Sequence, residues 1–224
     1  MSTRFDMTKL TRVVVAAACA LSSASCGGEL LRTGRAPVIL VLQTLAAASG
    51  NEPEEFVTPL LSDVQTMVET QINGQTVRVP TIFNDLGRAT ISAELKDQSS
   101  SIIRDPGNPV TAPSATALNQ VTITRYRVTY RRADGRNTPG VDVPFAFDGV
   151  ATATIPPGAS ANVVFDLVRH SSKSEPPLRP LIGSGGQIFI NAVAEVTFYG
   201  RDQNGNEVMV VGMIDVIFSD FGDS

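Results

Sequence analysis

The sequence predicts an all-β fold, an antiparallel β-sandwich of about nine strands. Short apolar and β-branched segments recur roughly every 8 to 12 residues between Gly-, Asn- and Pro-containing turns, a spacing typical of sandwiches and barrels. The strongest pattern closes the chain, where Gln187–Tyr199 and Glu207–Phe218 alternate apolar and polar residues around the turn at 200–206. Two alternating segments joined by such a turn predict a long antiparallel hairpin.

The first hundred residues carry further strand signals. Pro37 cannot continue a helix, and the apolar run Val38–Leu42 predicts a strand buried on both faces, with a helix through the following alanines as the alternative. Val64–Ile72 and Thr76–Ile82 flank an Asn-Gly pair, which predicts a tight hairpin whose second strand, because it contains a proline, lies at a sheet edge or bulges. Arg88–Lys96 alternates regularly and predicts a strand with one face in the core.

The second half predicts more strands and two long loops. Val121–Arg132 changes the phase of its alternation near Thr124 or Arg125, which predicts a β-bulge. Residues 98–119 and 171–186 predict two long loops that contain Pro, Ser and Gly. The segment 98–119 is the first candidate for a binding loop, with a disordered insertion as the alternative. The remaining strand segments are Val141–Phe147, Val150–Ile155 and Ala161–His170, with a turn expected at Asp148-Gly149 between the first two.

Residues 1–25 have the layout of a secretory signal peptide. Basic residues precede an apolar run that begins at Val13, and small residues lead to Cys26. The run is too short to span a bilayer, which takes about 20 apolar residues. Ala24, Ser25 and Cys26 resemble the lipobox of bacterial lipoproteins, although Ser23 stands where that family commonly has leucine.

The lipoprotein resemblance implies that Cys26 is diacylated and becomes the mature N-terminus. Cys19 is a poorer candidate, because only six residues separate it from Arg12 and a signal peptide needs an apolar region of about 7 to 15 residues. The alternative is ordinary signal-peptidase cleavage, which leaves Cys26 unmodified. Acylation would remove a thiol that has no partner in the mature chain, and it therefore fits an oxidising compartment better.

This interpretation divides the chain into a signal peptide (1–25), a short tether (26–36) and a β-sandwich domain (37–224). The lipid on Cys26 would make the membrane a partner of the protein. In the lipoprotein family, a residue other than an acidic one after the cysteine directs the protein to the outer membrane, so Gly27 implies a cell-envelope location there, facing the periplasm. A tether of about ten residues reaches roughly 15–20 Å, which keeps the domain close to the membrane.

Composition excludes several classes of function. The formal net charge is −4, whereas a general nucleic-acid-binding protein needs a basic footprint, so we expect no nucleic acid partner. The chain has one histidine and two cysteines, too few for an ordinary zinc site, and we expect no metal and no cofactor.

The closing hairpin resembles the last strands of bacterial immunoglobulin-like domains, which implies an immunoglobulin-like sandwich without the Trp of antibody domains.

Catalytic signals are weak. His170 lies beside Ser171 and Ser172, but no Gly-x-Ser-x-Gly sequence accompanies it, so we expect a structural histidine rather than a catalytic one. Asp202 begins an alternation of Asp and Asn that resembles a calcium loop, yet Met213 occupies the position where a bidentate glutamate is required. A hairpin turn needs the same residue types, and it is the interpretation we favour. We therefore expect no catalytic residue and no enzymatic activity.

The most suggestive cluster is basic and lies in an otherwise acidic chain. Its members fall within twelve residues and are candidates for binding an anion or a partner: Arg125, Arg127, Arg131, Arg132 and Arg136. The alternative is a solvated strand face whose arginines pair with Asp or Glu on neighbouring strands, or a sheet edge protected by charge. We favour this second interpretation.

Two functions remain from the sequence. The first is a membrane-anchored, non-enzymatic structural or protein-interaction module with a partner in the cell envelope. The second is a small-ligand or glycan-binding module that uses the loops at 98–119 and 171–186, which would then enclose a pocket. An envelope hydrolase is a distant third, because it would need a catalytic cluster around His170.

Overall fold

The computed structural model describes residues 35–96 and 116–221, and these form an all-β fold. The signal peptide, Cys26, most of the tether and residues 98–115 of the predicted 98–119 loop lie outside the described residues. The strands are β1 (Val38–Ala48), β2 (Leu60–Asp63), β3 (Thr66–Ile72), β4 (Gln75–Thr81), β5 (Asp85–Leu95), β6 (Val121–Arg131), β7 (Phe147–Ile155), β8 (Ser160–Val168), β9 (Phe189–Asp202) and β10 (Glu207–Ser219). The helical segments are η1 (Ala117–Asn119), α3 (His170–Lys173) and η2 (Arg179–Leu181).

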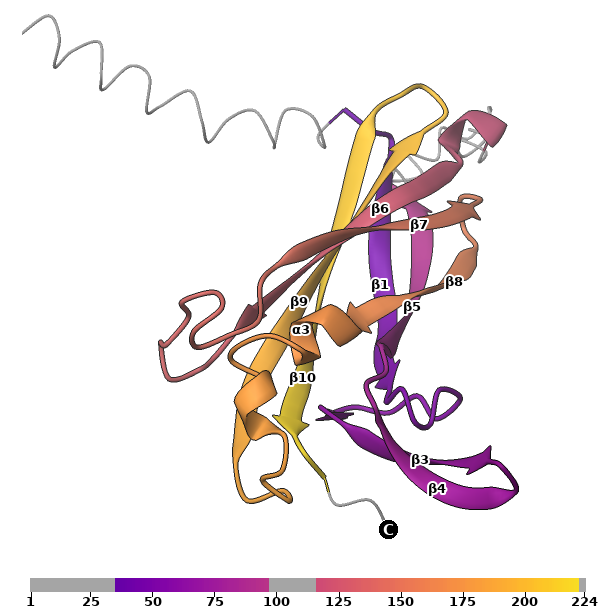
Figure 1. Ribbon diagram of the computed structural model, residues 1–224. Coiled ribbons are helices and arrows are strands. Elements are labelled where there is room, and N and C mark those ends of the chain that lie inside the picture. The colour runs from indigo at the N-terminus through magenta and orange to yellow at the C-terminus, as the bar shows by residue number, and fades with distance from the viewer. Residues whose placement is uncertain (1–34, 97–115, 222–224) are drawn as a thin grey trace, which may run out of the picture.

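Two sheets face each other as a sandwich, and a two-stranded ribbon projects from it (Figure 1). One sheet has the order β2-β10-β9-β6-β7, the other β1-β5-β8, and the ribbon is β3-β4. Gly212 on β10 shows how closely the sheets approach, since a Cβ there would lie 2.3 Å from Cδ2 of Leu42 on β1. The core lies between the two sheets and draws on both.

Aromatic and hydroxyl groups join the sheets across this core. Phe165 on β8 contacts Tyr126 on β6 and Phe198 on β9, with ring centroids 5.0 and 5.1 Å apart. The Tyr126 hydroxyl accepts a hydrogen bond from the Asp166 amide, and the Tyr130 hydroxyl donates one to the Leu167 carbonyl at 2.6 Å. These contacts hold the edge strand β8 onto the larger sheet, where burial without such partners would be costly.

Most of the predicted strands are confirmed. The closing hairpin β9–β10 pairs in antiparallel register from Phe189 to Ser219, and the Asn-Gly hairpin β3–β4 turns at Asn73 and Gly74, which have φ angles of 53° and 78°. β5 alternates with Ala89, Ile91 and Ala93 buried as expected. The bulge in β6 is confirmed too: the register with both of its neighbours shifts between Ile123 and Arg125. The predicted edge position of Pro80 follows, because each strand of a two-stranded sheet is an edge.

The prediction for the first strand is wrong in one respect. β1 runs to Ala48, beyond the apolar run, and it alternates rather than being buried on both faces, because Ile39 is 42% exposed. The physical reason is that β1 belongs to one layer of a two-layer sandwich, so only one of its faces meets the core. Ala36, expected in the tether, is buried in the core.

Three further features differ from the expectation. Val141–Phe147 is largely irregular, with one bridge between Pro139 and Val143. Asp148-Gly149 lies inside β7 rather than in a turn, because the Tyr126 ring lies over Gly149 and a Cβ there would come within 2.2 Å of it. Short parallel β2 beside β10 departs from the expected all-antiparallel pairing.

Residues 171–186 are not a simple surface loop. They contain most of α3 and all of η2, and Lys173, Leu178 and Leu181 are buried in or beside the core. His170 begins α3 instead of ending a strand. The segment closes one end of the sandwich, so its apolar side chains are occupied by packing.

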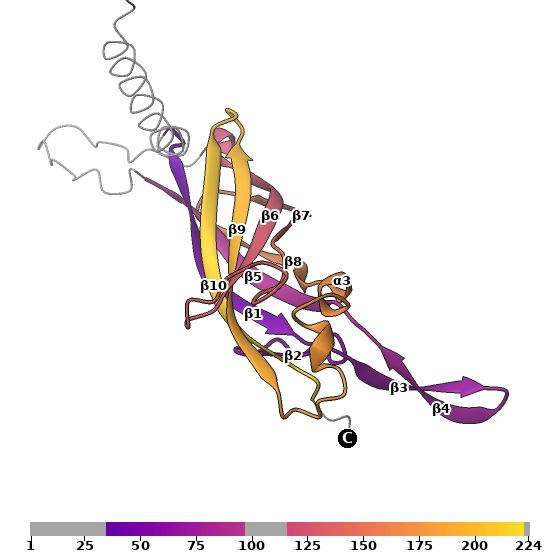
Figure 2. The same cartoon turned by 60° about the vertical axis from the view of Figure 1, so that its left-hand side comes forward.

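The two ends of the sandwich are structurally different. Pro37 and Lys96 lie together at one end, where the Lys96 amide donates to the Pro37 carbonyl at 2.9 Å. Asp85 begins β5 at the opposite end, about 33 Å away from Leu95 at a rise of about 3.3 Å per residue. Figures 1 and 2 show the β3–β4 hairpin projecting at the end of the sandwich opposite Pro37. We call the Pro37 end the tether end and the Asp85 end the distal end.

Candidate functional site

The distal end is fastened by a buried ion pair. Lys173 on α3 and Asp85 on β5 are 1% and 0% exposed, and Lys Nζ lies 2.7 Å from Asp Oδ1. Nζ also donates to the Asp63 carbonyl at 2.7 Å, while Ser62 and the Gly50 amide donate to the Asp85 carboxylate. Burial raises the pKa of Asp85, and these donors with the Lys173 charge oppose the rise. The network satisfies both charges, as a buried pair requires.

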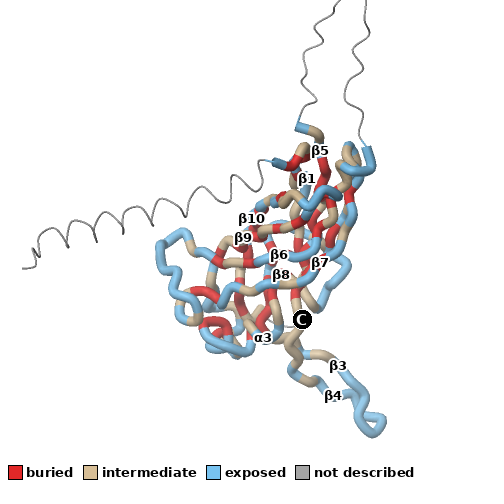
Figure 3. The backbone as a smooth tube through the Cα atoms, turned by 90° about the horizontal axis from the view of Figure 1, so that it is seen from above, coloured by how far each residue is buried: buried red, intermediate tan, exposed pale blue. Residues whose placement is uncertain are grey.

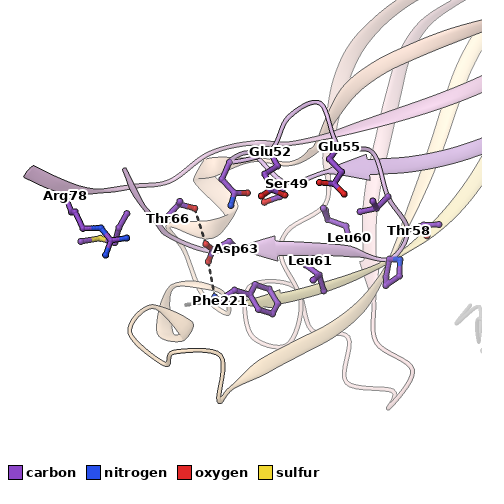
Figure 4. Close-up of a pocket in the computed structure, with 14 residues that line it drawn as sticks. Ser49, Glu52, Glu55, Thr58, Leu60, Leu61, Asp63, Thr66, Arg78 and Phe221 are labelled. Atoms are coloured by element: carbon purple, nitrogen blue, oxygen red, sulfur yellow. Dashed lines mark hydrogen bonds between the residues drawn. The ribbon is translucent and has the colours of Figure 1, made fainter. Parts of the chain in front are cut away.

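Asp63 lies at the base of the hairpin, at the end of β2. Its carboxylate accepts hydrogen bonds from the Thr66 hydroxyl at 3.1 Å and from the Phe221 amide at 3.2 Å (Figure 4). It thereby connects the start of β3 with Phe221, which lies two residues after the end of the last strand. Burial raises the pKa of Asp63 to about 6, and the charge on Asp220 adds to the rise, while these hydrogen bonds lower it.

A groove of about 710 Å³ opens beside Asp63. Its walls come from the loop before β2, from β2 itself, from the base of the hairpin and from the C-terminal segment (Figure 4). The ionisable side chains that line it are Glu52, Glu55, Asp63 and Arg78. Within residues 35–96 and 116–221, no three His, Cys, Asp or Glu side chains are placed to hold a metal ion.

The β3–β4 hairpin separates its residues by chemistry. Cross-strand pairs such as Val68 with Val79 and Thr70 with Val77 share one face, while Glu69 and Arg78 pair on the other. Ile72 and Val77 are 49% and 40% exposed on the first face. Figure 3 shows the ribbon exposed over most of its length and partly buried only near its base.

Each of the five candidate arginines lies next to a carboxylate. On β6, Arg125 and Arg127 both reach Asp148 of β7, at 3.6 and 2.7 Å, and Arg131 reaches Glu195 of β9 at 3.6 Å. Arg125 also stacks over the Tyr199 ring, 3.8 Å from its centroid.

The remaining two arginines, Arg132 and Arg136, share Asp134 in the turn after β6, at 2.7 and 2.8 Å. The two guanidinium groups hold the pKa of the Asp134 carboxyl well below its usual range. The five therefore form two separate groups, one on the strand face and one in the turn. Both groups have acidic neighbours, on an adjacent strand or in the same turn, as expected for a solvated strand face whose arginines pair with Asp or Glu.

The two other singled-out sites have local partners. The ring Nδ1 of His170 lies 2.9 Å from Oδ1 of Asn84, which also accepts from the His170 amide, so this contact fastens α3 to the segment before β5. Asp202 accepts hydrogen bonds from the Asn204 and Asn206 amides and from the Asn206 side chain. The calcium-like loop is therefore a hairpin turn organised by its own aspartate, as we expected.

Comparison with known proteins adds no family. The chain matches no protein-family model, no curated protein and no solved structure. Among residues 35–96 and 116–221, none of the helical segments has the length and apolar character needed to cross a bilayer.

Sequence reasoning missed the residues that organise the distal end. Asp85 and Lys173 are 88 positions apart, and no periodic signal connects them. The apolar face of the hairpin could have been predicted from the sequence. Val68, Ile72, Val77 and Val79 lie on the same side of two strands that were already predicted to pair. Alternation in the sequence shows that such a face exists, but only the folded structure shows that the face is exposed.

Proposed function

We propose that this protein is a membrane-anchored lipoprotein of the cell envelope that acts as a non-enzymatic protein-interaction module. The lipobox-like sequence ending at Cys26 supports the anchor, and the immunoglobulin-like interpretation of the sandwich is part of the same proposal. The projecting β3–β4 hairpin, with its apolar exposed face, is the surface that we assign to the interaction.

One observation carries this proposal: the hairpin and Pro37, at the start of β1, lie at opposite ends of the sandwich. A chain anchored at Cys26 would lie with the start of β1 toward the membrane and the β3–β4 hairpin away from it (Figure 2). The short tether keeps the tether end near the bilayer, and the hairpin then reaches farther by about 20 Å, the length of a seven-residue strand. This arrangement suits a partner located beyond the membrane surface.

The small-ligand or glycan-binding function receives less support. The described flank of the first loop, residue 96, lies at the tether end, whereas residues 171–186 close the distal end. The groove beside Asp63 is the feature that favours a ligand, and its lining includes Leu60, Met67 and Phe221. Its volume lies within the range of small-molecule sites. A ligand there would be detected by chemical-shift changes confined to these residues.

The test of the proposal is in-cell cross-linking of the full-length protein, followed by purification and mass spectrometry. Cys26→Ala should abolish incorporation of labelled palmitate and remove the partner, because the domain is no longer held at the membrane. Cys19→Ala is the matched control and should change neither result. Labelling that persists in Cys26→Ala would contradict the anchor, and a glycan or lipid recovered in place of protein would favour the ligand-binding function.

A further inference from the structure

One face of the β3–β4 hairpin is uncharged. Register places eight side chains on it, four apolar and four neutral polar: Val68, Ile72, Val77, Val79, Thr66, Thr70, Gln75 and Thr81. The only charged residues between 66 and 81, Glu69 and Arg78, pair across the strands on the opposite face. The hairpin is therefore neutral as a whole, in a chain of net charge −4.

The described part of the chain covers this face only near its base, where Thr66, Val68, Val79 and Thr81 are half-buried. β3 pairs with β4 alone, and the pair joins neither sheet of the sandwich. Ile72 and Val77, near the tip, are the more exposed of its apolar side chains (Figure 3). An isolated two-stranded hairpin is marginally stable in water and gains stability when its apolar face packs against another layer.

The outer edge of β4 is a poor place for another strand. Hydrogen-bonded and non-hydrogen-bonded pairs alternate away from the Ile72–Gln75 pair that closes the turn, so the Met67–Pro80 pair is of the second kind. The Pro80 nitrogen then faces outward and supplies no N–H to an added strand. Contact through the apolar face is therefore favoured over growth at this edge.

We propose that two copies of this protein associate by stacking the uncharged faces of their β3–β4 hairpins on each other. A second copy suits this face because stacking buries no charge and brings no like charges together at the contact. In a two-fold symmetric dimer both copies use the same surface, so this one face is enough to form the interface. This inference names the partner in the proposed function and rests on it for one step, the effect of the anchor on affinity.

The size of the face sets the strength of the contact. A ribbon about 20 Å long and 10 Å wide offers far less than the roughly 1,000 Å² of a stable interface. Stacking in dilute solution is therefore weak. Anchoring both copies in one membrane raises their effective concentration, and this converts a weak contact into a populated one.

Disulfide trapping of the anchored full-length protein tests the proposal. Val77→Cys places a thiol on the stacked face, and Thr76→Cys places one on the opposite face of the same strand as the matched control. With a mild oxidant in intact cells, Val77→Cys should form a covalent dimer of twice the monomer mass at least about tenfold faster than Thr76→Cys, because stacking raises the local thiol concentration. Equal rates for the two variants, no dimer, or a disulfide to a protein of different mass would overturn the proposal.

A second variant distinguishes specific stacking from disulfides formed by random collision. Ile72→Lys in the Val77→Cys background puts a like charge on each stacked face and should lower the dimer yield at least about fivefold. Met213→Lys changes a residue that is 65% exposed on the sandwich and should leave the yield unchanged. An unchanged yield with Ile72→Lys would contradict stacking.

The parent protein separates this inference from the proposed function. A disulfide dimer of the mature parent chain would come from an unacylated Cys26 and would contradict the lipid anchor. It would not bear on the hairpin contact, which is tested by comparing Val77→Cys with Thr76→Cys.

Discussion

The sandwich and the β3–β4 hairpin are built from similar strands and differ in what covers them. β9 buries Val196 and Phe198 completely against the opposite sheet, whereas the equivalent alternating positions Ile72 and Val77 of the hairpin remain 49% and 40% exposed. Sheets in a domain acquire stability from the layer that packs on them, and a lone ribbon lacks that layer. The comparison shows that no second layer within the described residues covers Ile72 and Val77 near the tip of the hairpin.

Polar ties differ in the same way. The distal end of the sandwich contains the fully buried Asp85–Lys173 pair with its accessory donors, while the strands of the hairpin are linked by an exposed hydrogen bond from Gln71 to Thr76 at 2.8 Å. Buried polar networks cost much when broken, and exposed ones cost little. Substitutions in the two regions should therefore differ strongly in their effect on stability.

The largest effect is expected for Lys173→Ala. It leaves Asp85 buried without its cation, so the free energy of unfolding should fall by about 3–5 kcal/mol. Denaturant unfolding measures this, with the exposed Arg179→Ala on the neighbouring η2 as control, expected to stay within about 0.5 kcal/mol of the parent. A loss below about 1 kcal/mol for Lys173→Ala would mean that the pair is not buried as described.

Asp63→Asn should change the pH dependence of stability. A carboxyl whose folded pKa is about 6, above its unfolded value of 3.8, stabilises the fold below pH 4 and loses that contribution as the pH rises through 6. The parent should therefore lose up to about 3 kcal/mol of stability from this group between pH 4 and 7.

The asparagine variant should lack this component, so its stability relative to the parent should rise with pH over that interval. Asp85, whose pKa burial also raises, remains in both proteins and cancels from the comparison. Denaturant unfolding at pH 4, 5, 6 and 7 provides the data. A difference between the two proteins that does not vary with pH would contradict the perturbed pKa.

Gly149→Ala should destabilise the sandwich by about 1–3 kcal/mol, because the added Cβ meets the Tyr126 ring in the core. Thr152→Ala, at an exposed position of the same strand, should stay within about 0.5 kcal/mol of the parent. Thermal unfolding of both variants measures the contrast. Equal stabilities would show that Tyr126 does not lie over Gly149.

The smallest effect is expected in the hairpin. Val77→Lys on the exposed face should change the free energy of unfolding of the dilute protein by no more than about 0.5 kcal/mol. Val196→Ala, on the buried face of β9, should lower the Tm clearly. A large loss of stability with Val77→Lys would show that the hairpin face packs on the sandwich and would remove the comparison.

Local signals were enough to predict much of the sandwich. Alternation identified β5, β9 and β10, and the phase change near Thr124 located the bulge of β6. These features depend on neighbours in the sequence, which is why they are visible there. The turn expected at Asp148-Gly149 was wrong because a glycine opposite an aromatic ring in a strand has the same local appearance as a glycine in a turn.

The distal end could not be predicted, because its organisation is non-local. Asp85 lies in a strand that was expected to begin at Arg88, and Lys173 lies in a segment that was expected to be a loop. Their ion pair depends on three elements meeting at that end. The arginine cluster is the reverse case, since local charge density suggested a site and the fold places an acidic residue beside each guanidinium group.

Hydrogen exchange of the lipid-anchored protein in vesicles, at low and at high surface density, tests the central claim most directly. Amides of β9 and β10 should be protected at both densities, because they belong to the covered sandwich. Amides of Val68 and Val79 should exchange quickly at low density and slow markedly at high density, as the hairpins stack. Protection of the hairpin equal to that of β9 at low density, or no slowing at high density, would contradict the account.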